Sequence, residues 1–320
     1  MMHRLETVDI NLKNQMRIKK TSLFQNREYI GDFTLIGSRE TKSENTSLSH
    51  LAWSYDQAFF MEGRMGHFVN VEDLSSNQVM HLIDRAIAYK KGEVKHVTGH
   101  VVNMFYENST RTKHSFEMAQ YRLGMHIINF EVQTSSVQKG ESLYDSLLTM
   151  KALGVDTAVI RHFDDNYYEP LMNLGINIVN AGSGCGSHPS QSLLDMMTIY
   201  EEFGNFESLT VAIIGDLVHS RVAHSNMQLL KALGARVLLV GPEWYFNERM
   251  LQWGEYVDIE TAIEISDVVM MLRVQLERHD DVMLMSAEGY HESYGLSLER
   301  QKRMKSHAII MHPKHLLIET

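Results

Sequence analysis

The strongest constraint on the fold is an alternation of short apolar stretches with longer helical ones, which begins near Met65. Gly124, Gly154 and Gly204 each follow a helical stretch and are suited to end it. Strands that alternate with helices predict parallel sheets with helices on both faces. We therefore predict an α/β fold of two doubly wound parallel-sheet domains, joined by a long helix over 189–203. The predicted strands cover 101–106, 126–130, 157–161, 176–180, 210–214, 236–240, 268–272 and 308–311. The other predicted helices cover 111–123, 143–153 and 222–233. One more helix is predicted to begin after a capping box at Ser75 and Gln78.

The same pattern sets the expected domain boundaries. Residues 1–64 show no sustained period, so we predict a disordered extension there. The codons for 62–64 can form a purine-rich run that resembles a ribosome-binding site. We interpret the extension as a translated leader before a start at Met65, with a regulatory extension as the alternative. Residues 65–195 then form the first domain, and 196–320 form the second.

Charge and cysteine content exclude several classes of protein. The formal net charge is -10 at pH 7, which argues against a general nucleic-acid binder. The single cysteine, Cys185, rules out an internal disulfide framework and suits a reducing compartment. No apolar run reaches the roughly 18–20 residues that span a bilayer, and the histidines lack the spacing of metal ligands. We predict a cytoplasmic protein without a metal site and without nucleic-acid or membrane partners.

A group of hydroxyl side chains around one arginine follows the first predicted strand. The stretch reads Ser109, Thr110, Arg111 and Thr112, at the point where a helix begins. Free N–H groups and the dipole at a helix N-terminus favour an anion, and a guanidinium binds one bidentately. We interpret this stretch as a phosphate-binding site. The alternative is an ordinary helix N-cap.

Other predicted strands also end in polar groups. Arg161 and His188 follow strands of the first series and could complete the phosphate site, with the histidine facing a carbonyl oxygen. Arg221 and Arg273 follow strands of the second series and are suited to carboxylates. In open parallel sheets ligands bind beyond the carboxyl ends of the strands. One substrate with a phosphate and another with carboxylates are therefore expected, although each arginine alone could be simply solvated.

Seven motifs together resemble the carbamoyltransferases, and in particular the aspartate carbamoyltransferase catalytic chains of Gram-positive bacteria. The resemblance runs from about Met65 to Pro313. The motifs read "FYENSTRTKHSFEMA", "SSVQKGESLYD", "AVIRH", "HPSQSLLDMMTIYEEFG", "VAIIGDLVHSRVAHSN", "MMLRVQLERH" and "AIIMHP".

The resemblance implies a reaction and a set of site residues. Carbamoyl phosphate and L-aspartate would give N-carbamoyl-L-aspartate and phosphate in pyrimidine biosynthesis, without a cofactor, a metal or a covalent intermediate. By motif match, the carbamoyl phosphate would be held by Ser109, Thr110, Arg111, Thr112, Arg161, His188 and Gln191, with catalytic roles for Arg111, Thr112, Arg161 and His188. The aspartate would be held by Lys139, Arg221, Arg273 and Gln275, next to a loop of backbone carbonyls that begins at Pro313.

The resemblance also implies a homotrimer with shared active sites. Ser135 and Lys139 would come from the neighbouring subunit, although an exposed turn would explain the same residues. Ornithine carbamoyltransferases are the close alternative because they share the Ser-Thr-Arg-Thr stretch. Arg273 and Gln275 favour a dicarboxylate, and the lysine of "SVQK" also follows the aspartate pattern.

The end of the chain departs from the family pattern. Family members continue after His-Pro with a loop close to Ala-Pro-Val-Asn-Arg, whereas this chain reads "HPKHLLIET". Codons for the last seven residues can be chosen that encode the family loop in another frame, so we interpret the end as a frameshift truncation. The 320-residue chain is then expected to have impaired activity. A catalytically inactive assembly subunit is a further alternative.

Overall fold

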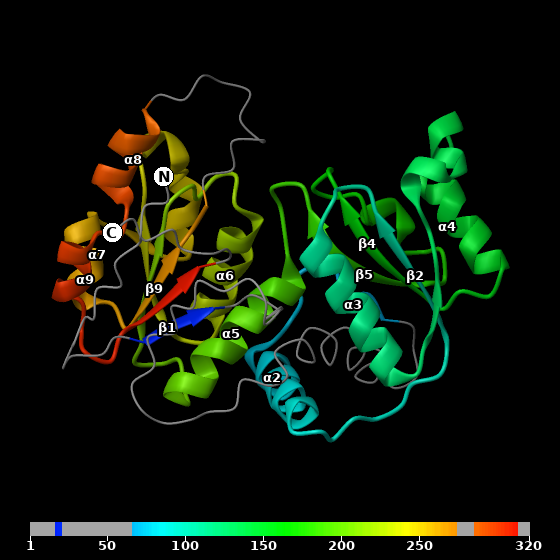
Figure 1. Cartoon of the computed structure of the whole chain (residues 1–320), viewed down its shortest axis with the longest axis horizontal. Helices are drawn as coiled ribbons and strands as arrows, with labels where there is room; N and C mark the ends of the chain where they lie inside the picture. Colours follow the sequence, from blue (N-terminus) through cyan, green and yellow to red (C-terminus); the bar gives the residue numbers. More distant parts are fainter. Residues whose placement is uncertain (1–16, 21–65, 274–284, 313–320) are drawn as a thin grey trace, which may run out of the picture.

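The computed structural model describes residues 17–20, 66–273 and 285–312. Its strands form two separate sheets in which every pairing is parallel (Figure 1). This architecture confirms the predicted α/β fold class.

The four-stranded sheet has the order β3-β2-β4-β5. Its helices cover both faces, as the alternation of side chains along β2 indicates. Val101 of β2 packs with Phe116 of α3 on one face, and Val102 packs with Leu147 of α4 on the other. The elements of this half are α2 (Ser76–Lys90), β2 (His100–Phe105), α3 (Thr110–Leu123), β3 (His126–Ile128), α4 (Leu143–Ala152), β4 (Thr157–His162) and β5 (Asn177–Ser183).

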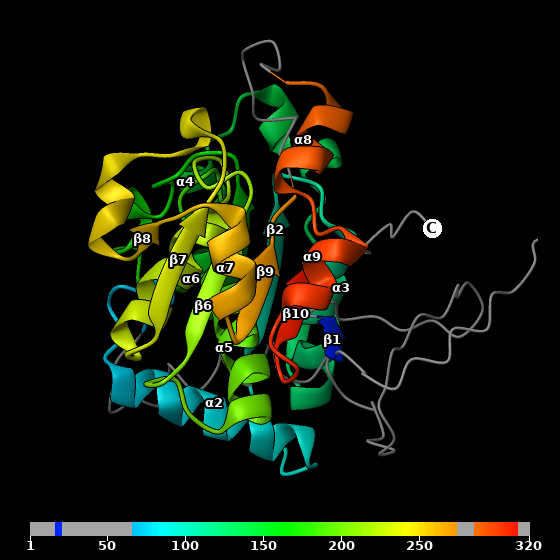
Figure 2. The same ribbon diagram turned by 90° about the vertical axis from the view of Figure 1, so that its left-hand side faces the viewer.

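The six-stranded sheet has the order β1-β10-β9-β6-β7-β8. Val211 of β6 faces the core that contains α6, and Ala212 faces the core that contains α7. Figure 2 views this sheet with α7 in front of it. The elements are β1 (Arg17–Lys20), β6 (Thr210–Ile214), α6 (Arg221–Ala232), β7 (Arg236–Val240), β8 (Glu255–Tyr256), α7 (Ile259–Ile265), β9 (Val268–Met271), α8 (Ala287–Tyr294), α9 (Leu298–Arg303) and β10 (Ile309–His312).

Helix α5 (Pro189–Phe203) follows β5 and precedes β6, so it lies in the chain between the two sheets. Figure 1 shows it between the two halves of the molecule, next to α2 and α6. The largest apolar core contains its residues Leu193 and Met196 together with Val101 of one sheet and Val211 of the other. The two sheets therefore share one core through α5.

Most predicted elements are confirmed, with ends shifted by a few residues. The predicted strand over 126–130 is shorter and ends at Ile128, because the chain turns into two short 3-10 helices soon afterwards. Four elements near the C-terminus, β8, α7, α8 and α9, were not predicted. They are two to eight residues long, which is too short for a clear period.

Four residues of the N-terminal extension belong to a sheet. Disorder was expected throughout 1–64, and it stays a prediction for this segment apart from Arg17–Lys20, which form β1 and pair in parallel with β10. The stretch "RIKK" is polar and lacks the alternation of a half-buried strand. Pairing with β10 supplies backbone partners to a strand that would otherwise lie at the sheet edge.

No helix among the described residues is long and apolar enough to cross a membrane.

Asp267 joins three strands of the six-stranded sheet at the start of β9. Its carboxylate accepts hydrogen bonds from the Thr210 amide at 2.8 Å, Lys305 Nζ at 2.8 Å and His307 Nε2 at 2.7 Å. Burial by itself raises the pKa of this carboxyl, but these bonds together lower the pKa below 3.8. A carboxyl with a lowered pKa stabilises the fold above the unfolded pKa, and this contribution is lost as the pH falls through the folded pKa.

We expect Asp267→Asn to lower the free energy of unfolding at pH 7 by about 1–3 kcal/mol. The difference from the unsubstituted chain should shrink as the pH falls below 3.8. Urea unfolding at pH 7 and at pH 3 measures both effects. Asp156→Asn is a matched control, because Asp156 also accepts a backbone amide, from His100 at 2.8 Å, but has an exposed side chain. An equal loss for both variants would contradict the role given to Asp267.

Candidate functional site

The N-terminus of α3 presents the hydroxyl groups predicted for phosphate. Ser109 is the N-cap residue, yet its side chain makes no capping hydrogen bond to the helix. The simple N-cap interpretation is therefore not supported. Thr110, Arg111 and Thr112 form the first turn of α3, where the helix dipole and the N–H groups favour an anion.

Two arginines that follow different sheets influence one another electrostatically. Arg111 lies in the first turn of α3, beyond the four-stranded sheet, and Arg273 follows β9 of the six-stranded sheet. Burial lowers the pKa of the half-buried Arg111, and the positive charge of Arg273 lowers it further. Two like charges at close range favour an anion between them, because an anion relieves their repulsion.

Glu107 joins the two halves of the site. Its Oε2 lies 3.2 Å from Nε of Arg161, which is near the end of β4, and 2.8 Å from Nη2 of Arg221, which begins α6. Arg221 is 4% exposed and also donates through Nη1 to the carbonyl oxygen of Gly184 at 3.2 Å. The carboxyl ends of both sheets therefore face one another across a cluster of guanidinium groups.

Gly182 allows this close approach. A Cβ atom at this position would lie 3.1 Å from Nη1 of Arg161 and 3.1 Å from Cζ of Arg221. The residue also has φ of 123°, a backbone conformation that favours glycine. The backbone at Gly182 therefore favours glycine, and a Cβ atom there would push the two guanidinium groups by a few tenths of an ångström.

We expect Gly182→Ala to lower kcat/KM of the activity proposed below by about 10- to 100-fold, because misplacement of the guanidinium groups by even 1 Å is costly. Steady-state kinetics with both substrates varied would measure the loss. Gly154→Ala is the control, since φ of Gly154 is 89° and nothing lies within 4 Å of its added Cβ. The control should lose about 1 kcal/mol of stability and keep its rate. Unchanged kinetics in Gly182→Ala would contradict this account of the site.

Helix α5 brings two further predicted residues to the site. His188 is its N-cap residue and is buried, with its backbone N–H donating to Ser225 Oγ on α6 at 3.1 Å. Gln191 lies one turn later, and its Nε2 donates to Oδ1 of Asp195 at 3.0 Å. Both residues belong to the helix that connects the two sheets.

Two of the predicted residues, Ser135 and Lys139, lie in the segment of short 3-10 helices between β3 and α4. Ser135 bonds within its own turn, where its Oγ donates to the Val132 carbonyl and accepts from the Val137 amide. Lys139 ends the second 3-10 helix of this segment and is exposed. Gln275 and Pro313 lie outside the described residues.

Three residues of the site were not predicted from the sequence: Glu107, Gly182 and Asp195. Glu107 stands two positions before Ser109 in the motif "FYENSTRTKHSFEMA", so its nearness to the predicted phosphate site could have indicated it. Gly182 gains its role from long-range contacts that no local pattern reveals, whereas Asp195 follows Gln191 by four residues on α5, so its spacing offered a signal. Among the described residues no cluster of His, Cys, Asp or Glu is suited to hold a metal ion.

Comparison with known proteins gives consistent matches. The family model for the carbamoyl-P binding domain of aspartate/ornithine carbamoyltransferase matches residues 66–201. The aspartate carbamoyltransferase catalytic subunit of Enterococcus faecalis is 52% identical over 253 residues, which cover 77% of this chain and 82% of that protein. The corresponding subunit of Streptococcus pneumoniae is 52% identical over 254 residues, with 78% and 83% covered.

Solved structures of a related protein have a similar fold. Aspartate transcarbamoylase from Trypanosoma cruzi in complex with N-(phosphonacetyl)-L-aspartic acid matches with a TM-score of 0.71 and 29% identity, over 79% of this chain and 85% of that one. The same protein in complex with carbamoyl aspartate and phosphate matches with a TM-score of 0.69 and 30% identity, with the same coverage.

Proposed function

The chain belongs to the aspartate/ornithine carbamoyltransferase family, as a relative of the aspartate carbamoyltransferase catalytic subunits, and on this premise we propose its reaction. It transfers a carbamoyl group from carbamoyl phosphate to L-aspartate, which gives N-carbamoyl-L-aspartate and phosphate for pyrimidine biosynthesis. The observation that carries the proposal is the position of Glu107, whose Oε2 lies 3.2 Å from Nε of Arg161 on one sheet and 2.8 Å from Nη2 of Arg221 beside the other. A phosphate site and a carboxylate site then adjoin one another.

In the proposed reaction the phosphate is bound at the N-terminus of α3. The hydroxyl groups of Ser109, Thr110 and Thr112 donate to it together with Arg111. The amine of aspartate attacks the carbonyl carbon, and a C–N bond forms. The C–O bond to phosphate then breaks, and the leaving phosphate takes the bonding electron pair and accepts the proton that the attacking nitrogen loses. Arg111 stabilises the charge that develops on it.

The carbonyl oxygen gains negative charge during the attack. Arg161 and His188 are assigned to it, with Thr112, by their positions in the motifs shared with the family. Fixed positive groups in a partly buried site stabilise this charge without reorganisation. The rate enhancement is then mainly a matter of positioning and electrostatics.

The carboxylates of aspartate are assigned to Arg221 and Arg273, with Gln275 beyond the described residues. Nη2 of Arg221 donates a hydrogen bond to Oε2 of Glu107 at 2.8 Å. An incoming carboxylate therefore has to compete with Glu107 for this guanidinium, or to share it. Planar guanidinium groups suit a dicarboxylate, which favours aspartate over ornithine as the second substrate.

A homotrimer with shared sites is the proposed assembly. Lys139 and Ser135 would then reach the site of the neighbouring subunit. Large apolar side chains on α3 and on α4, which follows Lys139 closely, support a subunit contact on this side. They are Met118, Tyr121, Tyr144 and Leu148, which are 40–74% exposed. Cytoplasmic location and independence of any cofactor are further parts of the proposal.

The test is product formation by the purified 320-residue chain with carbamoyl phosphate and L-aspartate, with L-ornithine in a parallel reaction. Formation of carbamoyl-aspartate, without citrulline, is the expected result. Citrulline formation would instead assign an ornithine-type activity. A chain that forms trimers but neither product would support the inactive assembly subunit.

A further inference from the structure

Asp195 is a buried carboxyl group that the proposed reaction does not use. It lies in the middle of α5 and is 2% exposed. Its Oδ1 accepts from Nε2 of Gln191 at 3.0 Å, and its Oδ2 accepts from Nδ2 of Asn226 at 2.8 Å. Both of its oxygens are therefore engaged by side-chain amides, one from its own helix and one from α6.

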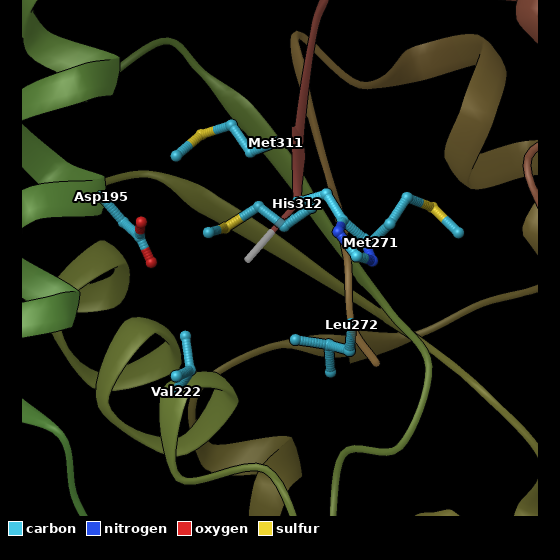
Figure 3. Close-up of a pocket in the computed structure, with 7 residues that line it drawn as sticks. Asp195, Val222, Met271, Leu272, Met311 and His312 are labelled. Carbon is cyan, nitrogen blue, oxygen red and sulfur yellow. The ribbon is translucent and has the colours of Figure 1, made fainter. Parts of the chain in front are cut away.

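The surroundings of Asp195 are otherwise mostly apolar. Figure 3 shows its carboxyl group on α5, pointing into a small cavity opposite Val222 and Met311, with Leu272 on the far side. Burial raises the pKa of Asp195 to about 7, although the bonds from Asn226 and Gln191 partly offset the shift. A carboxyl group in such a place is costly, and an apolar side chain would fill the space at less cost. A specific role for its two acceptor atoms would account for it.

We propose that Asp195 is a positioning residue, which turns the amide of Gln191 so that its carbonyl oxygen faces the carbamoyl N–H₂ of the substrate. This inference rests on the proposed function and on the assignment of Gln191 to carbamoyl phosphate. An amide group has one donor end and one acceptor end. Because Asp195 can engage only the donor end of Gln191 when it is ionised, the acceptor end is left for the substrate. The carbamoyl nitrogen is a donor only, so it requires that acceptor.

The second contact of Asp195 connects this amide to the other half of the site. Asn226 lies on α6, the helix that begins with Arg221. One carboxyl group thus ties the residue assigned to the carbamoyl amide to the helix assigned to the aspartate carboxylates. Asn226 also provides a control, because it contacts Asp195 without touching Gln191 in the described structure.

The test compares two ligands that differ in the amide. Phosphonoacetamide carries a phosphonate and an amide, whereas inorganic phosphate lacks the amide. We expect Asp195→Leu to weaken phosphonoacetamide binding by roughly 5- to 10-fold, the value of one hydrogen bond, and to leave phosphate binding within about twofold. Isothermal titration calorimetry on the full chain measures both affinities. Asp195→Ala removes the same acceptor with a smaller side chain and serves if leucine does not fit.

Three further variants make the result specific. Asn226→Leu should weaken phosphonoacetamide binding less than Asp195→Leu does, because Gln191 keeps its acceptor. In a Gln191→Leu background, Asp195→Leu should have no additional effect on phosphonoacetamide. Asp195→Asn should keep binding within about threefold, because the buried Oδ1 of Asn226 has no hydrogen-bond partner among the described residues, so Asn226 can turn over and receive the new N–H₂.

Several outcomes would overturn the inference. Equal weakening of both ligands in Asp195→Leu would indicate a general loss of structure. Additive effects of the Asp195 and Gln191 substitutions, or a defect in Asp195→Asn as large as in Asp195→Leu, would also contradict it. If the unsubstituted chain binds neither ligand, the proposed function fails and this inference fails with it. Normal binding of both ligands by Asp195→Leu would overturn the role of Asp195 alone.

Discussion

Replacement of Arg111 by alanine is expected to lower kcat for carbamoyl transfer by about 100- to 1,000-fold, the usual cost of losing one group that stabilises transition-state charge. Arg111 lies in the first turn of α3, where it is half-buried and lies within the electrostatic influence of Arg273. The first turn of α3, which is assigned to phosphate binding, contains no other arginine. The loss should fall mainly on kcat, because the charge on the leaving phosphate is greatest in the transition state.

Steady-state kinetics with the purified variant would measure this effect. Arg122→Ala is the matched control, because Arg122 lies in the last turn of the same helix and is exposed. It removes the same charge from the other end of α3, and its kcat should stay within about twofold. A similar kcat for Arg111→Ala and the unsubstituted chain would contradict the phosphate assignment.

A mixture of two inactive variants is expected to regain activity if active sites are shared. Lys139→Ala and Arg111→Ala should each be nearly inactive alone. In randomly mixed trimers, about a quarter of the sites would combine an intact Arg111 with an intact Lys139 from the neighbour. The activity should rise to that fraction of the unsubstituted value after the two proteins are dissociated and reassembled together.

Reassembly of each variant by itself is the control for this experiment. It should give no recovery, since every site then lacks the same group. If the mixture also stays inactive while trimers form, Lys139 acts within its own subunit or not at all. Recovery without trimers would contradict the proposed assembly.

The sequence predicted the fold best where strands are buried on both faces. Val101, Val159 and Val211 lie in uninterrupted apolar stretches, and each is a fully buried residue of a central strand. β8 has only two residues, Glu255 and Tyr256, and both are exposed, so no apolar stretch indicated it. β1 forms because an edge of β10 is available, which is information that its own four residues do not contain.

The sequence could also predict part of the candidate site. Arg111, Arg161 and Arg221 follow strands or begin helices, and the rule for parallel sheets places such residues at one edge. Glu107 and Gly182 act on those arginines from other segments of the chain, and this depends on how the two sheets face one another. Local patterns do not determine that arrangement. The role proposed for Lys139 would depend on a neighbouring chain, so a local pattern does not reveal it either.

The core that the two sheets share has a consequence for the chain as it leaves the ribosome. The strands of the four-stranded sheet all lie within 100–183, so they can pair while the second half is still being made. The buried face of α5, with Leu193 and Met196, must wait for Val211 and for α6. A nascent chain that pauses shortly after Phe203 would present this apolar face to water and to other nascent chains. This interval of synthesis is where the protein should depend most on chaperones.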